Sequence, residues 1–145
     1  MRFMVIVKAT PESEKPGSLP DPQGIAEMNK HIDELIAAGV LVGYDGLHPS
    51  SKGARVRFNG TARAVTDGPF AETKELIAGF MILRVNSLDE AIGWVKRMPC
   101  CSVTGEGEVE IRQVFEPEDF ATNFNEEEIE QERQIRAQLA EQAKK

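Results

Sequence analysis

The architecture of this chain is clearest around Asp67-Gly68-Pro69-Phe70-Ala71-Glu72-Thr73-Lys74-Glu75, a turn and a charged run that precede a strongly apolar segment. Pro69 fixes its own φ and restricts Gly68 to extended backbone, so the turn is stiff. Residues 75–85, which follow, are apolar on both faces, as in a central strand buried on both sides. We therefore expect a central strand that begins directly after this turn.

The residues before and after this segment show the apolar spacing typical of helices and strands. Towards the N-terminus, the pattern predicts a strand at residues 2–8, a helix at 22–38 and a strand at 40–44. Towards the C-terminus, Ser87 and Glu90 have the spacing of a capping box for a second helix, and residues 108–115 alternate as a final strand. The chain therefore reads β-α-β, then an insertion, then β-α-β.

The insertion is predicted to be a hairpin. Asn59-Gly60 separates residues 54–58 from residues 61–65, and Asn-Gly is a strong signal for a two-residue hairpin turn. Such a turn would pair Arg57 with Ala62 and Arg55 with Ala64. The two arginines then share one face with small side chains, which leaves room to bind a carboxylate or phosphate. The alternative is an ordinary solvated hairpin face.

The element order predicts an α+β fold of the ferredoxin-like, split βαβ type with a hairpin insertion. Two helices can cover only one face of its sheet. The central segment is apolar on both sides, so the face that the helices leave open would also be apolar. One side carries Leu76, Ala78, Phe80 and Ile82, and the other carries Ile77, Met81, Leu83 and Val85. Exposed apolar faces of that size usually mark interfaces, so we expect a homodimer.

The charge is concentrated in the C-terminal region. The chain carries a net charge of −7, and residues 116–145 hold nine acidic and four basic side chains, a net −5. We expect a domain at residues 1–116 and an acidic helical tail at residues 117–145, with an extra helix at 125–144. The acidic balance argues against a nucleic-acid partner. Without an apolar run long enough for a membrane, or a leader-like start, the expected location is the cytoplasm.

Two side chains are candidates for acid–base chemistry. Asp67 is held on the stiff turn, and His48 lies in a loop after the second strand; carboxylates and imidazoles are common general acids and bases. The alternative for Asp67 is a carboxylate that stabilises its own turn, and for His48 an exposed loop residue. No metal-ligand spacing is present, so neither a metal nor another cofactor is expected.

The remaining histidine and the two cysteines are assigned structural or passive roles. The apolar stripe of the first helix is predicted to be Ile25, Met28, Ile32, Leu35 and Ile36. His31 falls roughly 90° from this stripe, on the flank of the helix. Cys100 and Cys101 are adjacent and cannot form an unstrained disulfide with one another, which indicates packing residues in a reducing compartment.

Four stretches together resemble the DGPF branch of the YCII-related proteins: residues 47–50 (Leu-His-Pro-Ser), the 67–75 segment, Gly79-Phe80 and residues 87–92. The resemblance covers residues 2–116. It implies a ferredoxin-like subunit in a dimeric α/β barrel. It also implies a histidine–aspartate active site, although the family's usual positions are here Met28 and Met98. The DGPF-type motifs contain one histidine and one aspartate that could take these roles, and the resemblance therefore implies His48 and Asp67 as the pair in this chain.

The resemblance leaves two functions open. A few members of the family are lyases that act on small, unsaturated lactone-type compounds. By that reading, this chain is a cofactor-independent lyase or isomerase that holds a small anionic substrate with Arg55 and Arg57. Other relatives are encoded with, or fused to, sigma factors. By that reading, it is a non-catalytic ligand-binding or regulatory module associated with a transcription factor.

Overall fold

The central layer of the protein is an antiparallel sheet. The computed structural model describes residues 1–100, 102 and 104–144. Within these residues the main sheet consists of β1 (Arg2–Lys8), β2 (Leu41–Gly46), β5 (Ile77–Arg84) and β6 (Val109–Gln113), in the spatial order β2-β5-β1-β6. One helix follows β1 and another follows β5. This is the ferredoxin-like, split βαβ order, which confirms the predicted α+β class.

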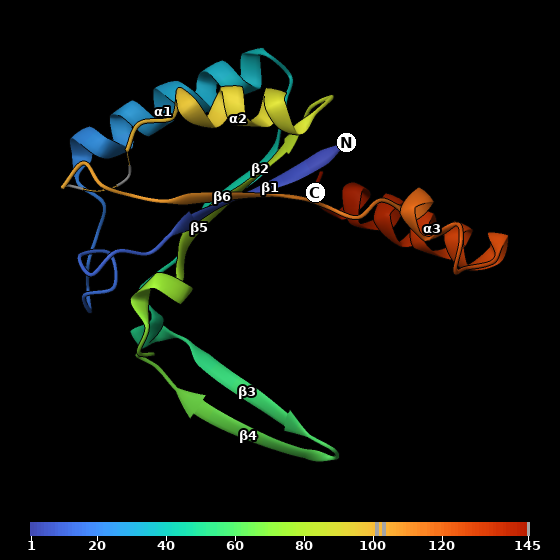
Figure 1. Cartoon of the computed structure of the whole chain (residues 1–145), viewed down its shortest axis with the longest axis horizontal. Helices are drawn as coiled ribbons and strands as arrows, with labels where there is room; N and C mark the ends of the chain where they lie inside the picture. Colours follow the sequence, from blue (N-terminus) through green and yellow to red (C-terminus); the bar gives the residue numbers. More distant parts are fainter. Residues whose placement is uncertain (101, 103, 145) are drawn as a thin grey trace.

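Helices α1 (Pro22–Ala37) and α2 (Leu88–Lys96) cover the same face of the sheet (Figure 1). Asp21 caps α1 by accepting hydrogen bonds from the amides of Gln23 and Gly24, at 2.9 and 3.0 Å. Ser87 caps α2 by accepting one from the Glu90 amide at 3.1 Å. The core between helices and sheet consists of Phe3, Val5, Ile32, Leu35, Met81, Leu83, Val85 and Ala91. Each large side chain buried there contributes about 1.5–3 kcal/mol to folding.

The buried face of α1 differs from the predicted stripe. Its buried residues are His31, Ile32 and Leu35, whereas Ile25 is 43% and Ile36 59% exposed. The prediction that His31 lies on the flank is therefore wrong, because the side chain is only 4% exposed. The contact face is rotated from the centre of the apolar stripe, so that Ile32 and Leu35 join the core on the sheet.

Among the residues that the structure describes, no helix or strand covers the opposite face of the sheet. On β5, Gly79, Met81 and Leu83 are buried, whereas Ala78, Phe80 and Ile82 are only partly buried. Met4 pairs with Ile82 and Ile6 with Phe80 across β1 and β5, so these four side chains form a half-buried apolar patch on the open face. β5 is thus fully covered on one face only, and the homodimer remains a prediction.

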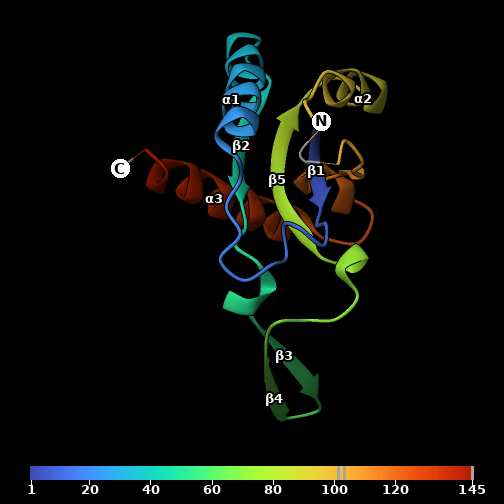
Figure 2. The same ribbon diagram turned by 90° about the vertical axis from the view of Figure 1, so that its left-hand side faces the viewer.

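Strands β3 (Ala54–Asn59) and β4 (Ala62–Asp67) form a separate two-stranded hairpin that extends away from the main sheet (Figures 1 and 2). Every residue of both strands is exposed. The observed register pairs Asn59 with Ala62, Arg57 with Ala64 and Arg55 with Thr66. The predicted register is therefore wrong: the turn lies one residue later, and each arginine pairs with a residue two positions further along β4, although Arg55 and Arg57 do share a face. Asn59 belongs to the ladder, and Gly60, at φ 57°, begins the turn.

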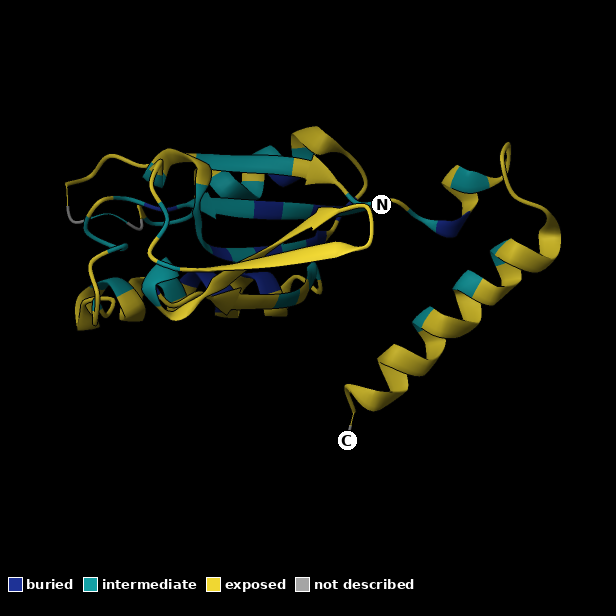
Figure 3. Cartoon of the chain, turned by 90° about the horizontal axis from the view of Figure 1, so that it is seen from below, coloured by how far each residue is buried: buried dark blue, intermediate teal, exposed yellow. Residues whose placement is uncertain are grey.

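The C-terminal region forms an arm beyond the end of the sheet (Figure 3). It consists of the short helix η3 (Pro117–Phe120) and helix α3 (Glu126–Gln142), the latter capped by a reciprocal Asn125–Glu128 capping box. This confirms the predicted extra helix. Among the described residues, no helix combines the length and apolar character needed to cross a bilayer.

The arm is attached beside the sheet through Arg136, which donates to the Glu116 carboxylate and, at 3.1 Å, to the Phe115 carbonyl. Glu116 accepts hydrogen bonds from Arg2 on β1, at 2.8 and 3.1 Å, and from Arg136 on α3, at 3.1 Å. Arg136 also pairs with Glu132 at 3.0 Å, as its i, i+4 spacing predicts. The hydrogen bond from Arg2 lowers the pKa of Glu116, and the nearby Arg136 charge adds to this effect. Glu116 is therefore ionised at neutral pH while it is bonded to Arg2 and Arg136.

Candidate functional site

The 67–75 segment packs against the loop that follows β2, and together they form the base of the hairpin. This loop contains the short helix η1 (Ser50–Lys52). The Gly68 amide donates to the Gly53 carbonyl at 2.9 Å, and the Phe70 amide donates to the Ser50 hydroxyl at 3.1 Å. Gly68 approaches the Ser50 carbonyl so closely that a Cβ atom would overlap it. The glycine is therefore required by a backbone contact, and the Gly68–Pro69 peptide is cis.

A third segment joins this base through Glu14. Its carboxylate accepts hydrogen bonds from the Ser50 amide at 3.2 Å and from the Ser50 hydroxyl at 2.6 Å. Ser50 thus links the proline-rich loop before α1 to the turn at Phe70. Neither Glu14 nor Ser50 was recognised from the sequence as a site residue. They lie 36 positions apart, and no local pattern relates them.

Arg55 is fixed above this base. Its guanidinium lies 4.0 Å from the centre of the Phe70 ring, a cation–π contact that orients a planar, permanently charged group. Arg57 follows on the same face of β3, opposite Ala64. The small Ala64 leaves space beside Arg57. The sequence predicted the same effect, but with Ala62 as the partner. The arrangement presents two cations on one face of the hairpin, and one of them is held in place by an aromatic ring.

The candidate acid–base residues lie near this base without bonding to one another. Asp67 pairs with Ala54, so strand alternation directs it to the opposite face of the hairpin from Arg55. His48 is exposed in the loop two positions before Ser50. Among the described residues, neither side chain makes a hydrogen bond or an ion pair. The structure therefore places Arg55, Arg57, Asp67 and His48 around the hairpin base, but it does not join the last two as a dyad.

The buried histidine on α1 has a different environment. His31 Nδ1 is buried and has no hydrogen-bond partner among the described residues. Burial lowers the pKa of His31; the Glu34 charge opposes this shift, and the Arg97 charge adds to it. The side chain is therefore a neutral core residue near pH 7.

Sequence comparison places these features in a family. A profile of the YCII-related domain matches residues 1–118. The chain belongs to the YCII-related family. The match includes the sheet, both covering helices, the hairpin and the Ser50–Phe70 contact, and it ends before α3 begins. Membership of the DGPF branch remains a prediction from the 67–75 segment.

Two proteins similar to this chain can be described. An uncharacterised protein of Rhizobium meliloti (strain 1021) is 35% identical over 85 residues, which is 58% of this chain and 68% of that protein. A solved structure of 5-chloro-2-hydroxyhydroquinone dehydrochlorinase from Burkholderia phenoliruptrix, in complex with 2,5-dihydroxybenzoquinone, superimposes with a TM-score of 0.45. It is 16% identical, and the alignment covers 79% of this chain and 94% of that one.

The described part of the YCII-related domain also contains a small cavity of about 200 Å³ at the end of the sheet near the C-terminus of α2. Its lining includes Lys8, Ser13, Met98 and Cys100. Cys100 is exposed, so its prediction as a packing residue is wrong, and Cys101 lies outside the described residues. Within the described ranges, no three histidine, cysteine or acidic side chains come together as a metal site.

Proposed function

We propose that this YCII-related chain, as a DGPF-type member, is the subunit of a cytoplasmic homodimeric enzyme that acts on a small anionic organic substrate. Its reaction is a proton transfer of the lyase or isomerase type that needs no cofactor. Arg55 and Arg57 hold the anion, and Asp67 or His48 moves the proton. The observation that carries the proposal is the Arg55 guanidinium held 4.0 Å above Phe70 at the hairpin base.

The chemistry of the hairpin base supports this role. A guanidinium oriented by a ring offers a carboxylate two parallel donors at little entropic cost. Arg57, one step further along the same face, adds a second positive charge. Asp67 terminates β4 on the opposite face, so a substrate that meets both the arginines and Asp67 must reach around the edge of the hairpin. His48, in the adjoining loop, is the other candidate for the proton transfer.

The homodimer supplies what a single chain lacks at this site. The hairpin is exposed along both strands, and isolated two-stranded hairpins are marginally stable in water. The half-buried patch of Met4, Ile6, Phe80 and Ile82 is an apolar surface that no described helix or strand covers. A second copy that packs on this face would shield both the sheet and the hairpin base, and would give the substrate a walled site.

Proton transfer can be tested without knowing the full reaction. The protein is incubated in D2O with a panel of small unsaturated carboxylates and lactones, and NMR follows deuterium uptake at the carbon next to the carbonyl. We expect at least one compound to exchange faster than in buffer. Asp67→Asn or His48→Gln should slow this exchange about 10²- to 10⁴-fold, the usual contribution of a general base.

Binding is measured separately from exchange by titration calorimetry with the same compounds. Arg55→Gln should weaken binding about 10- to 100-fold, because it removes a charge-assisted pair. Lys52→Gln is the matched control: it removes a nearby charge from η1 and should leave affinity unchanged. The enzymatic role is refuted if bound compounds exchange no faster than in buffer, or if neither Asp67→Asn nor His48→Gln changes the rate.

A second candidate function is a non-catalytic ligand-binding or regulatory module that works with a transcription (sigma) factor. The observation that favours it is the acidic helix α3, which lies outside the family-matched residues 1–118. In that case Arg55→Gln would abolish ligand binding, while no bound compound would exchange its protons. The same two measurements therefore separate the two functions.

A further inference from the structure

The tip of the β3–β4 hairpin carries an asparagine that is followed by a glycine. Asn59 is the exposed last residue of β3, and Gly60 begins the turn with φ at 57°. The carboxamide carbon of an asparagine and the backbone nitrogen of the next residue can close a five-membered ring, because one short stretch of chain holds them together. A side chain on the following residue would hinder this approach. Gly60 has none, and apart from its chain neighbours no atom lies within 4 Å of the position that a Cβ would take.

Both groups that would react at this tip are free. Among the residues that the structure describes, the Gly60 amide donates to no acceptor and the Asn59 carboxamide makes no hydrogen bond. The pairing of Asn59 with Ala62 in the ladder involves the backbone groups of those two residues. The Gly60 nitrogen is therefore available to attack, and the carboxamide can rotate towards it.

The other four asparagines of the chain are Asn29, Asn86, Asn123 and Asn125. At each of them one of the two reacting groups is engaged. Asn29 lies inside α1, where the helix uses the amide that follows it. The Asn86 carboxamide donates to Glu90 at 3.1 Å. The Asn125 carboxamide accepts from the Glu128 amide at 2.9 Å. After Asn123, the Phe124 amide donates to the Phe120 carbonyl at 2.9 Å. Within the described part of the chain, Asn59 is thus the asparagine at which neither group is held.

A positive charge lies beside the same turn. The Arg63 guanidinium donates to the carbonyls of Gly60 and Ala62, at 2.8 Å each. It also lies 4.4 Å from the centre of the Phe58 ring, which helps to hold it there. The attack requires the Gly60 nitrogen to lose its proton, and a nearby cation stabilises the negative charge that results. The turn therefore favours the reacting form of this nitrogen as well as leaving it open.

We propose that Asn59 and Gly60 form a self-modification site, which converts a neutral carboxamide at the hairpin tip into a carboxylate. The Gly60 nitrogen gives its proton to solvent and bonds to Asn59 Cγ, and the bond from Cγ to the carboxamide nitrogen breaks. Ammonia leaves, and a cyclic imide remains. Water then opens the ring at one of its two carbonyl groups, which yields aspartate or isoaspartate. The sum consumes one water and releases one ammonia, and no electrons are transferred.

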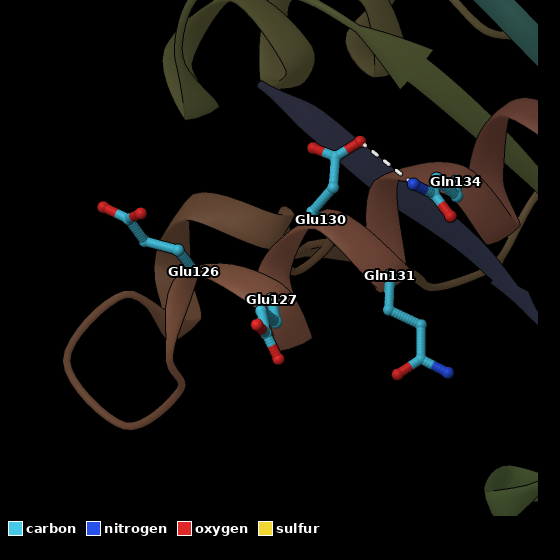
Figure 4. A pocket seen from close by; sticks show the side chains of 5 residues that line it. All are labelled: Glu126, Glu127, Glu130, Gln131 and Gln134. Carbon is cyan, nitrogen blue, oxygen red and sulfur yellow. Dashed lines mark hydrogen bonds between the residues drawn. The ribbon is translucent and has the colours of Figure 1, made fainter.

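The new carboxylate lies on the face of the hairpin that carries the arginines. Side chains alternate along a strand, so residue 59 shares a face with Arg57 and Arg55. Asp67 is on the other face, so the arginine face of the hairpin carries no acidic side chain before the reaction. The acidic surface shown in Figure 4 lies instead on the α3 arm and consists of Glu126, Glu127 and Glu130. Conversion of Asn59 therefore introduces the first negative charge on the arginine face.

This charge weakens the anion binding proposed above, a consequence that rests on the proposed function. Residues i and i+2 of a strand lie about 7 Å apart, a separation at which two unit charges in water change an affinity about 3-fold. The reaction does not reverse, because the ammonia is lost. It therefore acts as a time-dependent reduction in the affinity of the Arg55–Arg57 pair for its substrate.

Mass spectrometry of the ageing full-length protein tests the modification. Freshly purified protein is kept in neutral buffer at physiological temperature, and samples are digested with trypsin at intervals. Cleavage after Arg57 and Arg63 isolates residues 58–63, so conversion of Asn59 appears as the mass change from a carboxamide to a carboxylate. We expect Asn59 to be lost first, to aspartate and isoaspartate, while the other four asparagines remain unchanged over the same interval. Asn59→Gln is the matched control, because its longer side chain would need a six-membered ring and should not convert.

An affinity measurement tests the consequence. Crotonate, a small unsaturated monocarboxylate, is titrated into each protein and followed by NMR. Asn59→Asp should bind crotonate about 3-fold more weakly than Asn59→Gln, and aged wild type should approach the Asn59→Asp value. Circular dichroism melts establish that each variant is folded.

The outcomes separate this proposal from the proposed function. If Asn59 stays intact, or if another asparagine converts as fast, the self-modification site is overturned and the Arg55–Arg57 site is unaffected. If the two variants bind crotonate equally well, the modification has no effect on the anion site, and that part of the proposal is overturned. If crotonate and the other carboxylates of the panel bind neither fresh wild type nor the variants, the anion site of the proposed function fails, whereas the mass measurement still decides the modification. Selective loss of Asn59, together with the weaker binding by Asn59→Asp, supports the proposal.

Discussion

A methyl group at Gly68 is expected to open the base of the hairpin. The added Cβ of Gly68→Ala would overlap the Ser50 carbonyl oxygen and lie 2.7 Å from its carbonyl carbon and 3.3 Å from the Gly53 carbonyl oxygen. All three are backbone atoms, so no side chain can rotate to relieve the overlap. Overpacking of this kind costs about 1–3 kcal/mol. Loss of the Gly68–Gly53 hydrogen bond adds about 1 kcal/mol, for an expected total of about 2–4 kcal/mol.

The assay combines urea unfolding with hydrogen exchange. Because the hairpin forms a sheet of its own, part of this cost can appear as local opening, so the amides of Gly53, Gly68 and Phe70 should exchange faster in the variant. Gly46→Ala is the control: a Cβ there meets nothing within 4 Å, and stability should change by less than about 0.5 kcal/mol. If Gly68→Ala matches wild type both in urea and in exchange of these amides, the proposed backbone contact is wrong.

Three further predictions concern single side chains. Glu14→Ala should lower stability by about 1–3 kcal/mol by leaving the Ser50 amide without its acceptor, and should speed tryptic cleavage after Lys52; an unchanged cleavage rate would contradict the link. Glu116→Gln should increase hydrogen exchange across residues 126–142, and in wild type the same loosening should occur only as pH falls through the lowered pKa of Glu116. The pKa of His31 is lowered by burial, so the unfolded chain binds its proton first and stability falls as pH drops below about 6.5. His31→Leu should reduce this fall in urea titrations between pH 5 and 8, and identical pH profiles would exclude the effect.

The elements that could be predicted from sequence are those specified by short-range patterns. Asp21 before Pro22, and Asn125 with Glu128, are local capping signals, and both helices begin where these residues place them. The strand order follows from the succession of elements together with the preference for a split βαβ arrangement. The central strand was recognised from its apolar composition, a property of the segment itself that does not depend on which strands lie beside it.

The features that could not be predicted depend on contacts between distant segments. His31 is buried because of the angle at which α1 meets the sheet, which helical periodicity alone does not define. The turn of the hairpin lies one residue later than predicted, and every cross-strand partner is displaced by two residues, because Asn59 stays in the ladder and Gly60 begins the turn. The Glu14–Ser50 link joins residues that share no local pattern, so only the folded chain brings them together.

The firm attachment of the hairpin base has a mechanical consequence. Ser50 and Gly68 hold one end of an arm about 20 Å long, while the other end is free. Such an arm is a lever: a rotation of about 10° at the base moves its tip by about 3.5 Å over the strand length. A ligand that shifts the Phe70 ring by a small amount would therefore produce a large displacement near Gly60. Spin labels at the tip would register this movement long before the core of the protein changed.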